Sequence, residues 1–185
     1  MEWEFTDVND PDMGYSYGEP QIGRSNYNGG KWVVIVSNGY NSTEADGRVG
    51  SGKAVLFVLD PKDGSQIAKI EVGNGTTSSP SGLSTPVAVF ADGDANADYA
   101  YAGDLDGNMW KFDVTSSSPS SWSATKLYST GSNRPITGKP TVGNHPANLP
   151  GRIVYFGTGK YIESSDTAST PTQAFYGILD DDSCS

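Results

Sequence analysis

Cysteine and histidine are almost absent from this sequence, which has one cysteine, Cys184, and one histidine, His145, among 185 residues. A single cysteine cannot form a disulfide within the chain. The sequence has almost no histidine or cysteine from which to form a zinc centre or a Ser-His-Asp or Cys-His catalytic site. His145 precedes a proline in a polar segment, and we expect it to be a surface or loop residue. The sequence therefore predicts a protein that is not an enzyme.

Positive charge is also scarce, since 12 Lys and Arg face 22 Asp and Glu for a formal net charge of -10. This balance argues against nucleic acid and against an anionic membrane surface as partners, because polyanions are repelled. No apolar run approaches the length of a transmembrane helix, and no secretory signal pattern is present. The first five residues, MEWEF, and the acidic end, DDDSCS, resemble internal boundaries, so we interpret residues 1–185 as part of a longer protein.

Long stretches with a helical period are missing, while 23 Gly, 11 Pro and 10 Tyr are present. This composition is typical of an all-β protein rich in turns. The apolar, β-branched runs 31–37, 54–60 and 152–157 predict buried strands, and residues 66–72 alternate between polar and apolar. We expect residues 1–19 to form an irregular lead-in.

A repeated pattern gives the architecture. Pro20, Pro86 and Pro140 each stand at the start of an apolar strand that is followed by a loop and by a second strand ending near glycine. The spacings of 66 and 54 residues suit propeller blades with long loops. Roughly three blades are expected, fewer than the four to eight that close a ring, so sequence outside the chain would complete it. The blade-like units cover about 19–72, 85–129 and 139–180.

One loop has the residues of a metal site. Asp92, Asp94, Asn96 and Asp98 alternate with small residues, so the backbone can curl while oxygen-bearing side chains converge. Such spacing suits a hard cation with six to eight oxygen ligands, in practice Ca²⁺. The loop is shorter than an EF-hand loop and lies between strands. The alternative is a loop of Asx turns without a metal, since Asp and Asn also bond nearby backbone amides.

Other motifs have simpler interpretations. Residues 47–53, GRVGSGK, resemble a phosphate-binding P-loop, but Ala54 follows and a strand begins there, so a flexible hairpin loop is favoured. Residues 104–108, DLDGN, predict a hairpin turn and not an acid/base pair. Trp32, Trp110 and Phe112 lie on predicted strands, and we expect them in the core or between blades.

Segments along nearly the whole chain resemble the C-terminal domain of the PilC/PilY type IV pilus biogenesis proteins. In order they are 19–22 (EPQI), 36–42 (VSNGYNS), 54–60 (AVLFVLD), 83–86 (LSTP), 99–114 (YAYAGDLDGNMWKFDV), 155–162 (YFGTGKYI) and 173–180 (QAFYGILD). The resemblance implies a modified β-propeller similar to that of quinoprotein dehydrogenases, without known catalysis. It also implies an exported parent protein at the bacterial cell surface, on the pilus tip or outer membrane, that works with pilins and the assembly machinery in pilus biogenesis, control of retraction, twitching motility and adhesion.

The same resemblance implies a calcium loop of the pattern D-x-[ND]-x-D-x-[hydrophobic]-x-D. Laid on this chain without gaps, the pattern assigns side-chain ligand positions to Asp92, Asp94 and Asp98 and the backbone-carbonyl position to Asn96. It places Phe90 at the first ligand position, where this sequence departs from the family because phenylalanine has no oxygen. Either Asn96 or a water molecule would then supply the missing ligand, or the site would bind Ca²⁺ more weakly or be lost.

Two other functions fit parts of the sequence. A fragment of a quinoprotein oxidoreductase would share the blades, but it needs a cofactor-clamping set of residues that is not seen here; an absorbance change on adding pyrroloquinoline quinone would reveal it. A structural adhesin module with a degenerate metal loop would bind a glycan or a host protein regardless of chelator. The open edges of an incomplete propeller also predict that this fragment forms dimers.

Overall fold

The computed structural model describes residues 2–40, 42–43, 47–147 and 149–181. Within these residues the chain forms 11 strands in three antiparallel sheets and three short 3₁₀ helices, η1 (Tyr27–Gly29), η2 (Pro119–Ser121) and η3 (Ser164–Ala168), with no α-helix. The predicted all-β class is confirmed. Cys184 lies outside the described residues.

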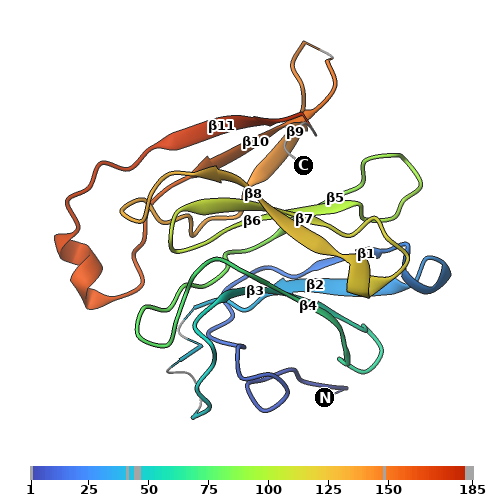
Figure 1. Ribbon diagram of the computed structural model, residues 1–185, viewed down its shortest axis with the longest axis horizontal. Helices are drawn as coiled ribbons and strands as arrows, with labels where there is room; N and C mark the ends of the chain where they lie inside the picture. The colour runs from blue at the N-terminus through green and yellow to red at the C-terminus, as the bar shows by residue number, and fades with distance from the viewer. Residues whose placement is uncertain (1, 41, 44–46, 148, 182–185) are drawn as a thin grey trace.

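Each sheet takes its strands from one continuous stretch of chain, and the three sheets are stacked on one another (Figure 1). The first two sheets have four strands each in chain order, and the third has the order β11-β10-β9. The strands are β1 (Gln21–Arg24), β2 (Trp32–Ser37), β3 (Ala54–Leu59), β4 (Gln66–Val72), β5 (Val87–Val89), β6 (Tyr99–Gly103), β7 (Asn108–Asp113), β8 (Ser123–Ser129), β9 (Thr141–Asn144), β10 (Arg152–Gly157) and β11 (Phe175–Asp180).

The main core lies between the first and second sheets. Alternate residues of β3 point into it, including Leu56 and Val58, and they meet Phe112 of β7. Phe112 is fully buried and Trp110 is half-buried against this core, as expected from the sequence. Trp32 is different, because it begins β2 at the sheet end and 56% of it is exposed. The prediction of a packed Trp32 is therefore wrong.

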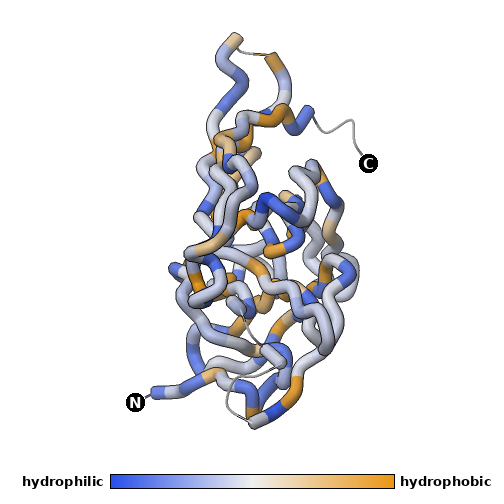
Figure 2. The backbone as a smooth tube through the Cα atoms, turned by 90° about the vertical axis from the view of Figure 1, so that its left-hand side faces the viewer, coloured by the Kyte–Doolittle hydropathy of each residue, from blue (hydrophilic) through white to orange (hydrophobic). Residues whose placement is uncertain are grey.

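A second core joins the second and third sheets, and the hydropathy colouring of Figure 2 shows hydrophobic stretches running through the middle of the stack. Tyr101 and Met109 of the second sheet pack there with Phe156 of the third. At the edge of this core the Tyr101 hydroxyl donates to Asp180 Oδ2 at 2.5 Å, and Lys111 Nζ lies 2.9 Å from the same oxygen. Because Asp180 is buried, this ionic contact fixes how the two sheets dock.

The irregular segment before β1 covers the outer face of the first sheet. Trp3, Phe5 and Met13 pack on a third apolar cluster that includes Phe57. The rings of Phe5 and Phe57 meet edge to face at 5.1 Å, and the Trp3 indole N–H donates to the carbonyl of Pro61 at 3.0 Å. The lead-in is irregular, as predicted, and it also seals a sheet face that would otherwise be open to water.

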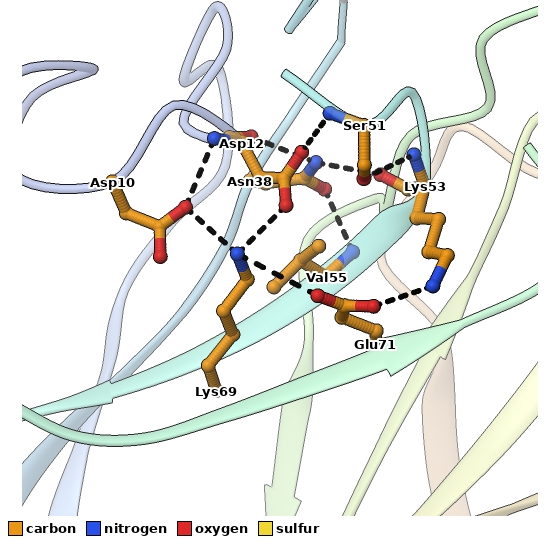
Figure 3. Close-up of polar contacts among 8 residues, drawn as sticks. All are labelled: Asp10, Asp12, Asn38, Ser51, Lys53, Val55, Lys69 and Glu71. Carbon is orange, nitrogen blue, oxygen red and sulfur yellow. Dashed lines mark hydrogen bonds and ion pairs between the residues drawn. The ribbon is translucent and has the colours of Figure 1, made fainter. Parts of the chain in front are cut away.

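A cluster of buried charges holds this segment in place (Figure 3). Lys69 Nζ of β4 lies 2.9 Å from Asp10 Oδ1, 2.7 Å from Asp12 Oδ2 and 3.6 Å from Glu71 Oε1. Asp12 also accepts a 2.5 Å hydrogen bond from the Ser51 amide. Burial alone raises the pKa of Asp12, but the hydrogen bonds from Lys69 and Ser51 outweigh it and hold that pKa below the ordinary value. Lys69 therefore bridges the first sheet and the segment across it.

Asn38 completes this network from the end of β2. Its Nδ2 donates to the carbonyls of Asp12 and Lys53, and its Oδ1 accepts the amides of Val55 and Leu83. All four bonding positions of the amide are thus used, as the burial of Asn38 requires.

The outer face of the third sheet remains apolar and exposed. Tyr155, Phe175 and Leu179 are 39%, 75% and 46% exposed, and the rings of Tyr155 and Phe175 stack at 6.4 Å. The side chains facing the other way, such as Val154 and Phe156, are buried in the second core. The period of two in β10 and β11 therefore gives one covered face and one open face.

Candidate functional site

The loop predicted to bind a metal joins β5 to β6 and lies at the right-hand end of the sheets in Figure 1. Two consecutive Asx turns shape it: the Asp94 amide donates to Asp92 Oδ1 at 3.0 Å, and the Asn96 amide donates to Asp94 Oδ1 at 2.7 Å. Gly93 and Ala95 have φ of 85° and 67°, left-handed values that let the backbone curl between the polar residues.

Asp98 lies apart from the two exposed carboxylates. It is 4% exposed, and its Oδ2 accepts the Ala91 amide at 2.5 Å, so it closes the base of the loop. Asp92 and Asp94 are on the surface. In the part of the chain that the structure describes, no three His, Cys, Asp or Glu side chains are grouped as metal ligands. The fold thus brings together Asp92, Asp94 and Asn96, with Asp98 committed to a backbone amide.

Asn96 ties the loop to the first sheet. Its Nδ2 donates to Asn26 Oδ1 at 2.9 Å and to Asp94 Oδ2 at 2.7 Å, and the next amide, that of Ala97, donates to the Arg24 carbonyl. Its Oδ1 is buried and accepts no hydrogen bond from the described residues. An unpaired buried acceptor is costly, and an oxygen of this kind suits a hard cation.

Hydrogen bonding also sets the charge of this loop. The backbone and side chain of Asn96 both donate to Asp94 and hold the pKa of its carboxyl below the ordinary value, with a further contribution from the charge of Arg24. Asp94 is therefore ionised at neutral pH, and the loop presents acceptor oxygens to water.

Phe90 has a structural role that the sequence did not predict. Its ring lies against Gly23 of β1, where an added Cβ would be 2.9 Å from Phe90 Cζ. The position that the family pattern gives to a ligand is thus used here to pack β5 onto the neighbouring sheet. No local signal identifies this contact, because Gly23 and Phe90 lie far apart in the sequence.

The turn between β6 and β7 is a hairpin, as predicted, and it has a buried anchor that the sequence did not reveal. Asp104 is fully buried and accepts the Asn108 amide at 2.8 Å and the Trp110 indole N–H at 2.7 Å. Burial raises the pKa of Asp104, against the effect of these hydrogen bonds. Gly107, at φ 77°, completes the turn. His145 lies in a loop as expected, and its Nδ1 accepts the Ala147 amide at 3.2 Å.

Among the described residues, no helix has the length and apolar character needed to cross a bilayer.

Comparison with known proteins gives consistent matches. The family model described as the PilY1 beta-propeller domain matches residues 6–185. The type IV pilus biogenesis factor PilY1 of Pseudomonas aeruginosa PAO1 is 37% identical over 204 residues, an alignment that covers 96% of this chain and 17% of that protein. A PilY1 homolog of Xylella fastidiosa Temecula1 is 35% identical, with 96% of this chain and 13% of that protein covered. The chain thus spans less than a fifth of the length of these relatives.

The fold agrees as well. The crystal structure of the P. aeruginosa PilY1 C-terminal domain superposes with a TM-score of 0.81 at 35% identity, covering 99% of this chain and 41% of that chain. The three stacked sheets are therefore part of a β-propeller, as the repeated pattern predicted. With the family model matching nearly all of its residues, the chain belongs to the PilY1 β-propeller domain family.

Proposed function

We propose that this chain is a non-enzymatic propeller domain of a type IV pilus-associated protein at the bacterial cell surface, acting in pilus biogenesis, control of retraction, twitching motility and adhesion. The observation that carries the proposal is the similarity to proteins named as type IV pilus biogenesis factors over 96% of the chain, together with the common fold. Pilins and the assembly machinery are the partners that this role requires.

A domain exchange tests this role. In P. aeruginosa, the matching segment of PilY1 is replaced by residues 6–180 of this chain, and surface pili and twitching zones are measured beside a strain lacking that segment. We expect the exchange to restore both clearly above the deletion strain. An exported hybrid at normal abundance that restores neither would refute a role in pilus biogenesis.

The loop from Asp92 to Asp98 is proposed as a calcium site that supports this domain. Its chemistry suits the ion: the exposed carboxylates of Asp92 and Asp94 lie in one short loop with Asn96, whose buried Oδ1 accepts no hydrogen bond from the described residues. Bound Ca²⁺ would supply positive charge beside the carboxylates of Asp92 and Asp94. Because the Ala97 amide donates to the carbonyl of Arg24 in β1 and Asp98 holds the loop base, order in the loop would be transmitted to β1 and β5.

Calorimetric titration of chelator-stripped protein with Ca²⁺, beside a thermal melt, tests the site. Saturable binding that raises Tm and disappears in Asp94→Ala is the expected result. Asp63→Ala is the matched control, because Asp63 is also an exposed aspartate whose Oδ1 accepts the amide two residues later. No heat and no shift in Tm would refute the calcium site and leave the pilus role intact.

Self-association of the isolated chain is proposed on the open face of the third sheet. Tyr155, Phe175 and Leu179 form an exposed apolar patch there, and such patches favour association in water.

A further inference from the structure

A polar groove lies at the end of the sheets opposite the loop from Asp92 to Asp98. It consists of two adjoining hollows of about 530 and 450 Å³, and Asp106 and Ser132 line both of them. The hollows flank the β6–β7 turn, one toward Trp110 and the end of β4, the other toward the β10–β11 connection at the left of Figure 1. The two form one groove with Asp106 at its centre.

The smaller hollow has a rigid wall. Asn108 and Trp110 both line it, and both are held by the buried carboxylate of Asp104 through side-chain hydrogen bonds of 2.9 and 2.7 Å. Thr130 Oγ1 lies 2.9 Å from the carbonyl oxygen of Gly107 and 2.7 Å from that of Arg134, and its single O–H bonds the next connection to the turn. Asn108 and Trp110 are therefore positioned before any ligand arrives, which lowers the entropic cost of binding.

The larger hollow is also preformed. Asp166 accepts the amides of Ile162 and Glu163 at 2.7 and 2.8 Å, and Lys160 Nζ lies 3.3 Å from Asp166. These contacts hold the long β10–β11 connection in place, and Lys160, Glu163 and Asp166 all line the hollow. Their charges are largely internally paired, so the connection acts as a wall more than as a charged site.

The lining combines one aromatic ring with many groups that both donate and accept hydrogen bonds. Asn74, Ser79 and Asn108 line the smaller hollow together with Trp110, and amide and hydroxyl groups continue into the larger one. Amides and hydroxyls serve as donors and acceptors, and the indole offers apolar surface. A ligand dense in hydroxyl groups with a small apolar face matches this set.

Other ligand classes fit poorly. Drug-sized apolar ligands bind sites lined mainly by hydrophobic side chains, whereas polar residues dominate here. A polyanion is disfavoured by the net charge of -10 and by Asp106 at the centre. A peptide added as a strand needs an open sheet edge, and the groove is bordered chiefly by turns and connections.

We propose that this groove is a binding site for a neutral oligosaccharide, with Asp106 accepting sugar hydroxyls where the hollows meet, Trp110 covering an apolar sugar face and Lys126 donating from β8. The site is independent of the calcium loop, which lies at the other end of the sheets, and it does not rest on the role in pilus biogenesis.

Titrations of the purified chain with maltotriose, N,N′-diacetylchitobiose and lactose test the proposal, followed by tryptophan fluorescence and saturation-transfer NMR. At least one of these sugars should bind saturably at or below ~10 mM. Asp106→Ala and Lys126→Ala should each weaken binding about tenfold, the loss of one charged hydrogen bond. Trp110→Phe should abolish the fluorescence change that accompanies binding.

The matched controls are Asp63→Ala and Lys62→Ala, an acidic and a basic residue in the β3–β4 turn at the opposite end, which should bind like the wild type. Circular dichroism establishes that each variant is folded. Three results would each overturn the proposal: no saturable binding of any of the three sugars, equal binding by both groove variants and the wild type, or tighter binding of a sialylated trisaccharide than of the neutral sugars.

Discussion

Replacing Lys69 by methionine tests whether the charge cluster of Lys69, Asp10 and Asp12 stabilises the fold more than an ordinary surface ion pair does. Methionine keeps an unbranched apolar stem beside the ring of Phe57, over which Lys69 Nζ lies at 5.9 Å. The substitution removes the ammonium group, with both its positive charge and its hydrogen-bond donors, and keeps the apolar stem. Asp10 and Asp12, whose side chains are 12% and 5% exposed, then remain without their shared cation.

The expected cost follows from burial. Breaking a buried ion pair by removing one partner costs about 3–5 kcal/mol. The Lys69 side chain is 22% exposed, so we take the lower end, about 3 kcal/mol. For a domain of this size that loss lowers Tm by about 6–12 °C. The N-terminal segment should also detach more readily, because Lys69 is its ionic link to β4.

Lys53→Met is the matched control, because Lys53 also pairs with Glu71, at 2.6 Å, but with side chains 42% and 38% exposed. Such a surface pair contributes about 0.5 kcal/mol. Urea unfolding followed by circular dichroism gives both values, and limited proteolysis reports release of the segment before β1. If the two variants lose the same free energy of unfolding, within about 0.5 kcal/mol, Lys69 contributes no more than a surface ion pair and the reasoning is refuted.

Three further predictions follow from single contacts. The pKa of Asp12 lies below its unfolded value, so the contribution of Asp12 to stability is present above about pH 4 and is lost as pH falls further. The difference in urea midpoint between the wild type and Asp12→Asn should therefore decrease between pH 6 and pH 3. A difference that stays constant over this range would contradict the prediction. Gly103→Ala should cost about 1–3 kcal/mol of unfolding free energy because the new Cβ would overlap Cγ2 of Ile136. Gly143→Ala meets no atom within 4 Å and should cost less than about 1 kcal/mol in the same unfolding assay. Phe175→Ser should reduce self-association in sedimentation velocity, and unchanged association would exclude the open third-sheet face as the contact.

Much of the fold was predictable because its signals are local. The apolar runs at 31–37, 54–60 and 152–157 correspond to β2, β3 and β10, since strand formation depends on nearby β-branched residues and bounding turns. The turn at 104–108 and the Asx turns at 92–96 were also predictable, because Asp, Asn and Gly residues within these segments form them. Of the candidate site, the sequence therefore predicted the polar residues and the curl of the loop.

The direction taken by individual side chains was less predictable. Trp32 is apolar and lies on a strand, yet it is exposed because it stands at the end of β2. Phe90 packs on Gly23, and Asp98 turns to the amide of Ala91 in place of a position among the other acidic groups. These outcomes depend on which neighbour each strand end meets, and the periodicity of a single strand carries no such information.

By itself, then, the sequence determined the all-β class, the strands and turns, and membership of a propeller family. The strands and turns depend on local residue patterns, and the family is recognised from similarity spread along the whole chain. Only the tertiary structure decided how the sheets and the N-terminal segment lock together. Lys69 meets Asp10 and Tyr101 meets Asp180 across separations of 59 and 79 residues. Which residues pair in this way depends on how the sheets pack and on which charges become buried, and neither is defined until the chain has folded.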